Sequence, residues 1–134
     1  VERLRKIPGV VVTGHVPDVR PFLKDASVSV APLRMARGTQ NKILESMSMG
    51  LPVVATPEAA KGIQANAEEH ILVAGTPERF AGKVVEVLMN PQLRMSFANA
   101  GREQVNSAHV WSRSMELLDS IFMESGVERA STVG

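Results

Sequence analysis

Short apolar runs alternate with helical patterns along this chain, and that alternation limits the fold more than any other feature. The runs lie at residues 10–13, 28–31, 52–56 and 71–74. They are rich in β-branched residues and too short for helices, so we predict strands. Strands separated by helices favour a parallel sheet. Because the runs are apolar almost throughout, both faces of that sheet should be covered. The sequence therefore predicts an α/β fold with a parallel sheet and flanking helices.

Helices are predicted from their start and stop signals. They are expected at residues 1–7, 18–26, 40–49, 76–90, 93–100 and 111–122. Asp18 and Thr76 are candidate N-caps, and Gly50 is a natural residue just past a helix end. Residues 57–69 are expected to be irregular or weakly helical. Trp111 opens the last apolar stripe, which we interpret as core. Residues 125–134 are small and polar, and we expect a disordered tail there.

Composition excludes several classes of protein. A length of 134 residues suits one domain, and a net charge of +1 argues against nucleic-acid binding. Cysteine is absent, which excludes disulfides and zinc–thiolate sites. No apolar run approaches the length of a membrane span. His15, His70 and His109 are too widely spaced for a metal-binding pattern, so no metal is expected.

Ligands of open parallel sheets bind outside the carboxyl ends of the strands. Three predicted loops leave those ends, at residues 14–17, 32–38 and 56–58. The middle loop carries Arg34, Arg37 and Gly38 and leads directly into a predicted helix. Backbone N–H groups at such a helix start attract anions. This loop is therefore either a phosphate cradle or an ordinary strand-to-helix turn.

Two charged residues in the helix after that loop also have two interpretations. Lys42 and Glu45 are three residues apart and share one face. They could form a surface ion pair. Alternatively, the carboxylate could accept hydrogen bonds from two vicinal hydroxyls, with the ammonium beside a phosphate. His15 lies at a predicted strand end, where it either lines the pocket or is a bystander.

The stretch at residues 38–55, GTQNKILESMSMGLPVVA, resembles the signature of family 4 glycosyltransferases with the GT-B fold. Those enzymes carry a helical glutamate, a turn of small residues and then Gly-x-Pro-Val-Val-Ala. Residues 13–19, 28–34 and 93–122 resemble the flanking parts, so the likeness covers about residues 10 to 122. The Arg-x-x-Arg-Gly and Asn-Lys-x-x-Glu patterns most resemble sugar transferases of bacterial exopolysaccharide and exosortase loci.

The resemblance implies a Rossmann-like donor-binding domain, the C-terminal half of a GT-B fold. It implies that Glu45 holds the ribose hydroxyls of a nucleotide diphosphate sugar. It further implies the following contacts: the amides of Gly38, Thr39 and Gln40 at the diphosphate, His15 and Val16 at the base, and Pro32 and Thr56 along the pocket. Where the family has a first glutamate, this chain has Arg37. That residue, or Arg34, would instead reach a phosphate or an acidic sugar.

By the same resemblance, residues 1–124 are expected to be a partial domain without its first β-α-β unit. The acceptor half and the family's upstream phosphate-binding cations would lie outside the chain, and so would the catalytic residues. In the family's strand order, 3-2-1-4-5-6, the runs here correspond to strands 3 to 6. We therefore expect residues 10–13 to pair with residues 28–31, or a second copy to complete the sheet.

The full-length protein is accordingly expected to transfer a sugar, with retention of configuration, to a glycan or lipid-linked acceptor. It would work in the cytoplasm, at or near the inner membrane face, without a cofactor, and the present chain alone would be inactive. Two alternatives stay open. One is a nucleotide-binding module without transferase activity, and the other is a non-enzymatic, receiver-like interaction domain.

Overall fold

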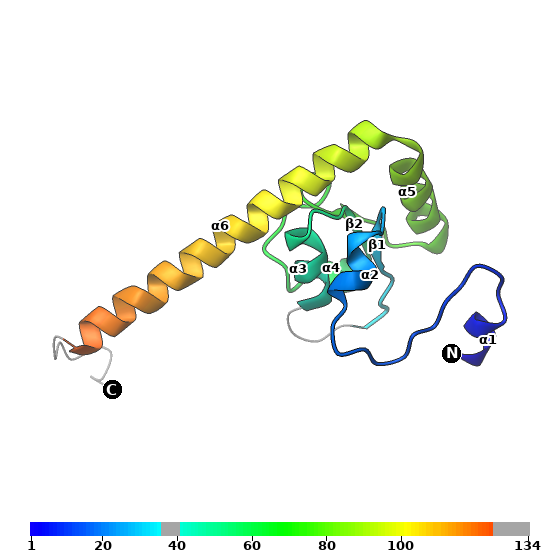
Figure 1. The fold of residues 1–134 in the computed structure, drawn as a ribbon. Helices are drawn as coiled ribbons and strands as arrows, with labels where there is room; N and C mark the ends of the chain where they lie inside the picture. Colours follow the sequence, from blue (N-terminus) through cyan, green and yellow to red (C-terminus); the bar gives the residue numbers. More distant parts are fainter. Residues whose placement is uncertain (36–40, 125–134) are drawn as a thin grey trace.

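A computed structural model describes residues 1–35 and 41–124 of the chain. In order, its elements are α1 (Glu2–Arg5), α2 (Arg20–Lys24), β1 (Ser29–Ala31), α3 (Asn41–Ser48), β2 (Val53–Ala55), α4 (Pro57–Ala60), β3 (Leu72–Val73), α5 (Pro77–Met89) and α6 (Pro91–Glu124). Helices and loops surround a small central sheet, and α6 runs past it and away from the body (Figure 1).

The sheet has three parallel strands in the order β1-β2-β3. Ser29 pairs with Val53 and Ala31 with Ala55, while Val54 pairs with Leu72. These strands fall within three of the predicted runs. The α/β fold with a parallel sheet and flanking helices is therefore confirmed.

The core is divided between the two faces of β2. Val53 and Ala55 belong to one buried cluster and Val54 to the other, and none of the three is more than 1% exposed. Ile43 and Met47 of α3 pack on the first face, and Val87 of α5 and Phe97 of α6 pack on the second. The continuous apolar run thus reflects a strand covered on both sides.

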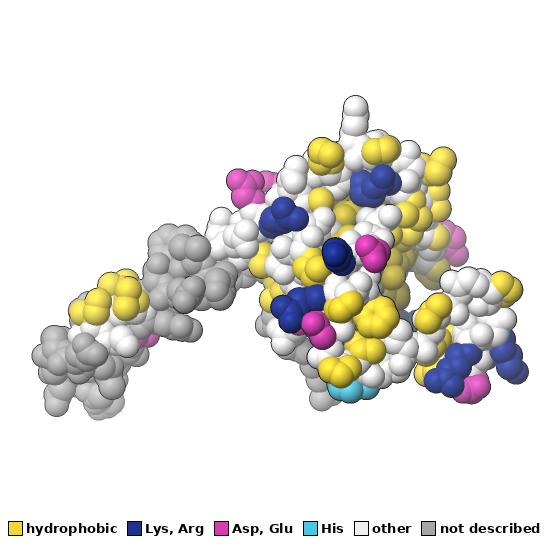
Figure 2. Space-filling view, viewed as in Figure 1, with side chains coloured by type: hydrophobic (Ala, Val, Ile, Leu, Met, Phe, Trp, Pro, Cys, Tyr) yellow, Lys and Arg dark blue, Asp and Glu magenta, His cyan; other side chains and the backbone are white. Residues whose placement is uncertain are grey.

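One predicted strand does not form. Residues 10–14 have no strand structure, and Val11 is 84% exposed. Within the described residues, β1 pairs with β2 only, so the expected pairing of residues 10–13 with residues 28–31 is wrong. A β-branched run becomes a strand only when a partner satisfies its backbone groups. Figure 2 shows the α1 region standing beside the body rather than packed into it.

The two closing helices expected at residues 93–100 and 111–122 are one continuous helix, α6. No proline lies between Pro91 and Glu124 to break it. Gly101, within the helix, is buried, and a Cβ there would lie 3.2 Å from the His70 carbonyl oxygen. This glycine therefore allows close packing instead of ending the helix. Leu118 of the predicted apolar stripe is 49% exposed, so it is not core; the Trp111 side chain lies outside the described part.

Candidate functional site

A hollow of about 610 Å³ opens between α2 and the exposed face of α3. Its lining includes Val16, Lys42 and Glu45, three of the residues proposed from the sequence. Val16, in the loop before α2, and Glu45, on α3, are far apart in the chain but line the same hollow. A volume of this size is within the usual range for small-molecule sites.

The amphipathic pattern of α3 orients Lys42 and Glu45 toward the hollow. Ile43, Ser46 and Met47 are buried against the sheet, which leaves Lys42 and Glu45 exposed on the opposite side. The Ser46 hydroxyl lies 2.9 Å from Ser29 Oγ, and this contact fixes α3 to β1. Ser46 is thus the buried serine of the helix, whereas Ser48 is exposed.

The end of α3 is fixed by a Schellman motif. The Leu51 N–H donates to the Ser46 carbonyl, and the Gly50 N–H donates to the Met47 carbonyl, both at 3.0 Å. Gly50 has a φ of +75°, as this turn requires. The motif confirms the predicted helix stop and leads the chain straight into β2.

No ion pair joins Lys42 to Glu45 among the residues that the structure describes. The surface-pair interpretation of these two residues is therefore not supported. The Glu45 side chain is left facing the hollow, where a carboxylate can accept two hydrogen bonds from neighbouring hydroxyls.

Arg20 is a lining residue that the sequence interpretation missed. Its Nε–H donates to Asp18 Oδ1 at 3.0 Å, and its Nη2 donates to Asp18 Oδ2 at 3.1 Å. Asp18 Oδ1 also accepts from the Arg20 backbone N–H at 3.0 Å. These hydrogen bonds hold the pKa of Asp18 below its usual value, and Asp18, with a smaller contribution from Glu45, raises the pKa of Arg20. In the sequence, the only indication of this pair was that Asp18 and Arg20 lie two residues apart.

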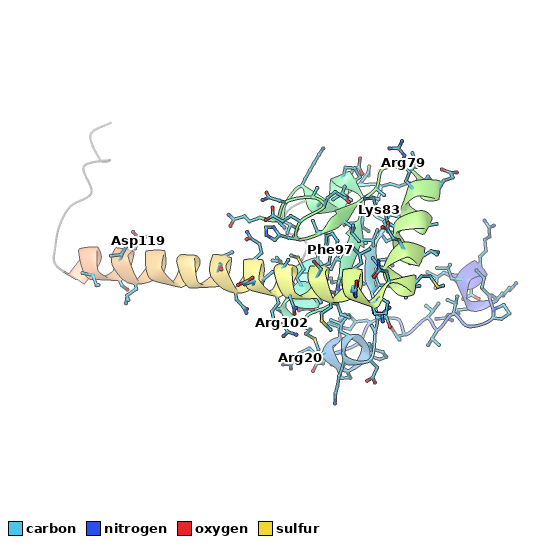
Figure 3. All side chains as sticks on the ribbon, turned by 90° about the horizontal axis from the view of Figure 1, so that it is seen from above. Arg20, Arg79, Lys83, Phe97, Arg102 and Asp119 are labelled. Carbon is cyan, nitrogen blue, oxygen red and sulfur yellow. The ribbon has the colours of Figure 1, made fainter. Side chains whose placement is uncertain are left out.

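Asp18 was predicted as the N-cap of the following helix. In the structure α2 begins one residue later, with Val19 as the N-cap and no capping side chain. The Asp18 carboxylate is instead committed to Arg20, whose side chain points outward from α2 (Figure 3).

Three other proposed residues lie around a separate hollow of about 320 Å³. Pro32, Arg34 and Thr56 line it, together with the first turns of α5 around Phe80. This hollow lies just past the carboxyl ends of the strands. The Thr56 hydroxyl donates to the Leu33 carbonyl at 2.5 Å and accepts from the Ala59 N–H at 3.3 Å. Thr56 therefore ties the loop after β1 to the start of α4.

The remaining proposed residues are not placed in either hollow. His15 is exposed and lines neither of them. Arg37, Gly38, Thr39 and Gln40 lie outside the described residues. In residues 1–35 and 41–124, no group of three or more acidic or histidine side chains could hold a metal ion. Nor does that part of the chain contain a helix long and apolar enough to cross a membrane.

Comparison with known proteins gives the family. The sequence model of the family described as "Glycosyl transferases group 1" matches residues 1–90, about two thirds of the chain. The chain belongs to this family. A Xenopus tropicalis relative, glycosyltransferase 1 domain-containing protein 1, is 23% identical to this group 1 chain over 123 residues.

A solved structure agrees with the fold. The C-terminal domain of a group 1 glycosyl transferase family protein from Francisella tularensis superposes with a TM-score of 0.64 at 19% identity. The match covers 72% of this chain and 51% of that one. The Xenopus match covers 90% of this chain but 35% of the relative, so the group 1 chain spans about a third of that protein's length.

Proposed function

We propose that this chain is the donor-binding part of a glycosyltransferase that uses a nucleotide diphosphate sugar. The observation that carries the proposal is the α2–α3 hollow, which brings Val16, Lys42 and Glu45 together. Membership of the group 1 glycosyl transferases supports it. Glu45 would accept hydrogen bonds from the two ribose hydroxyls, and the Lys42 ammonium would lie near a phosphate.

The rest of the donor would extend from this hollow toward the loop at residues 36–40. There the amides of Gly38, Thr39 and Gln40 would face the diphosphate, and Arg37 would bind a phosphate or an acidic sugar. Pro32, Arg34 and Thr56 border the second hollow, which would receive a further part of the donor. The loop that contains His15 would contact the nucleobase of the donor.

The type of transferase and its cellular role are proposed from the sequence patterns of the loop at residues 32–38 and of the helix that follows it. We propose a hexosyltransferase of bacterial exopolysaccharide or glycoconjugate synthesis that works in the cytoplasm at the membrane face. Its glycan or lipid-linked acceptor would be bound by a half of the enzyme that this chain does not contain. The chain by itself would bind donor weakly and turn nothing over.

The test uses the full-length protein and Glu45→Gln. Donor affinity is measured calorimetrically, and release of the nucleoside diphosphate measures turnover. A charge-assisted hydrogen bond is worth about 1.5–3 kcal/mol, so affinity should fall about tenfold or more. Glu86→Gln, an exposed glutamate on α5, is the matched control and should bind like wild type. Equal donor affinity in Glu45→Gln and wild type would remove the ribose assignment.

The same measurements separate a transferase from a nucleotide-binding module without chemistry. A binding module without chemistry would bind the nucleoside diphosphate. It would not release nucleoside diphosphate from the sugar donor, even when a cell extract that contains the acceptor is added. Turnover by the full-length protein would decide for the transferase.

A further inference from the structure

We propose that Arg20 reads the donor's base and selects an oxo base, uracil or guanine, over adenine. The inference rests on the proposed function, because it assumes that a nucleotide occupies the α2–α3 hollow. It concerns a residue for which neither the sequence motif nor the family match supplies a role.

The first step is the way in which Arg20 is held. Two of its five N–H groups, on Nε and Nη2, point at the carboxylate of Asp18. The guanidinium is planar and rigid, so this two-point contact fixes the direction of the opposite edge as well. Three N–H groups remain, and within residues 1–35 and 41–124 no hydrogen-bond acceptor is recorded for them. Arg20 therefore offers a pre-oriented pair of donors to a ligand.

The second step is the charge of the hollow. Its lining holds two cations, Arg20 and Lys42, and two carboxylates, Asp18 and Glu45. The formal charge of the wall is therefore zero. A diphosphate carries several negative charges. Next to Arg20 it would also meet the carboxylate of Asp18, so this wall attracts a diphosphate only weakly. A neutral, hydrogen-bonding group suits the surroundings of Arg20 better than a phosphate does.

The third step is the apolar part of the same wall. Val16, Pro17, Val19 and Met49 line the hollow beside the charged residues. Aliphatic side chains of this kind can cover the face of a flat ring, while Arg20 meets its edge. The geometry thus combines an apolar surface with outward-facing donors, the combination that a nucleobase requires.

The chemistry of the bases then decides the selectivity. Uracil and guanine carry carbonyl oxygens that accept from an arginine, and guanine can accept in a two-point contact. Adenine presents an amino group at the equivalent position, which is a donor. A donor facing a donor leaves both groups without a hydrogen bond, so adenine should bind more weakly.

The experiment measures the affinities of UDP, GDP and ADP for the full-length protein by calorimetry. These three ligands share the ribose and diphosphate and differ only in the base. Wild type should bind UDP or GDP more tightly than ADP. Arg20→Met keeps the aliphatic stem but removes the donors. It should weaken the preferred oxo-base ligand about tenfold or more, and it should leave ADP within about twofold.

Three further variants sharpen the result. Arg20→Lys keeps the charge but loses the planar fork, so it should behave like Arg20→Met if directed donors matter. Asp18→Asn should cause a smaller loss, again for the oxo base only. Arg79→Met, at an exposed position of α5 and well away from Arg20 (Figure 3), is the control and should change nothing. Arg20 is itself 73% exposed, so its replacement should leave the fold intact, and circular dichroism checks this.

The outcomes are distinct. A selective loss for UDP or GDP supports the inference. An equal loss for all three ligands, or rescue by Arg20→Lys, would show a phosphate contact and overturn it. Equal binding by wild type and Arg20→Met, or wild-type indifference to the base, would also overturn it while leaving the proposed function in place. Failure of wild type to bind any of the three would refute the proposed function, and this inference with it.

Discussion

Gly50 shows how one residue links the candidate site to the sheet. Its φ of +75° is in the left-handed region, which costs other residues about 1–2 kcal/mol. A Cβ at this position would also collide with the guanidinium of Arg102, which donates to the Met49 carbonyl at 3.3 Å. The residue therefore lets α3 turn into β2 and lets α6 hold the turn from outside.

We expect Gly50→Ala to lower the free energy of unfolding by at least about 1–2 kcal/mol, because backbone strain adds to the displaced Arg102 contact. The matched control is Gly82→Ala, inside α5, where a new Cβ meets nothing within 4 Å. That change should stabilise the protein by about 0.5–1 kcal/mol. Urea unfolding of both variants gives the two values. The same sign for both substitutions would show that the turn conformation has no special role.

At this scale the sequence predicted some residues and could not predict others. The three-residue spacing of Lys42 and Glu45 indicated that they share a face of α3, and both line the hollow; Val16, which lines it too, was suggested only by the family resemblance. The burial of Ser46 and the exposure of Ser48 were harder to predict, because both are small polar residues and the packing of the helix decides which one is buried. Arg20 was missed because its place in the lining of the hollow depends on its pairing with Asp18 and on the packing of the chain around α3, and neither follows from the local sequence pattern.

Among the elements, α6 packs closely against the body of the molecule at one glycine. It crosses the core at Gly101, where a Cβ would lie 3.2 Å from the His70 carbonyl and 3.5 Å from Met47 Cε. Further along the same helix, Gln104 donates to the Gln64 carbonyl at 2.7 Å. The helix can therefore lie against the loop before β3 only while residue 101 is small.

Gly101→Leu is expected to push α6 away from this loop and to cost about 1–3 kcal/mol, the usual range for overpacking a buried site. Ser96→Leu introduces the same side chain at an exposed position of α6 and should have little effect. Thermal unfolding of the two variants measures the difference. Similar melting temperatures for both would mean that α6 is not packed tightly at this point.

The elements also show where the sequence pattern is enough to predict a strand or helix and where it is not. Strands form within residues 28–31, 52–56 and 71–74 because each has a neighbouring strand, whereas residues 10–13, although equally apolar, pair with no strand among the described residues. The joined α6 was missed for a similar reason. Two separate apolar groups suggested two helices, but residues 101–108 contain no proline to break the helix between them.

On the scale of the whole molecule, the sheet has an open edge. Within the described residues, β1 is hydrogen-bonded on one side only, and Val30 in its centre is 49% exposed. Unpaired N–H and C=O groups on such an edge can pair with another chain. The β-branched run at residues 10–13 pairs with no strand in the part of the chain that the structure describes, so each copy carries both an open edge and a candidate strand.

We therefore predict that residues 1–134, expressed by themselves, associate in a concentration-dependent way through β1. Sedimentation velocity should show a mass that rises from one chain toward two. Val30→Lys places a charge in the centre of the edge, a common way to block edge pairing, and should keep the chain monomeric. Val85→Lys makes the same change at a 56% exposed position of α5 and should leave association unchanged. A monomer at every concentration, or equal association of all three chains, would contradict pairing at this edge. Association blocked by both lysine substitutions would point instead to a general loss of apolar surface.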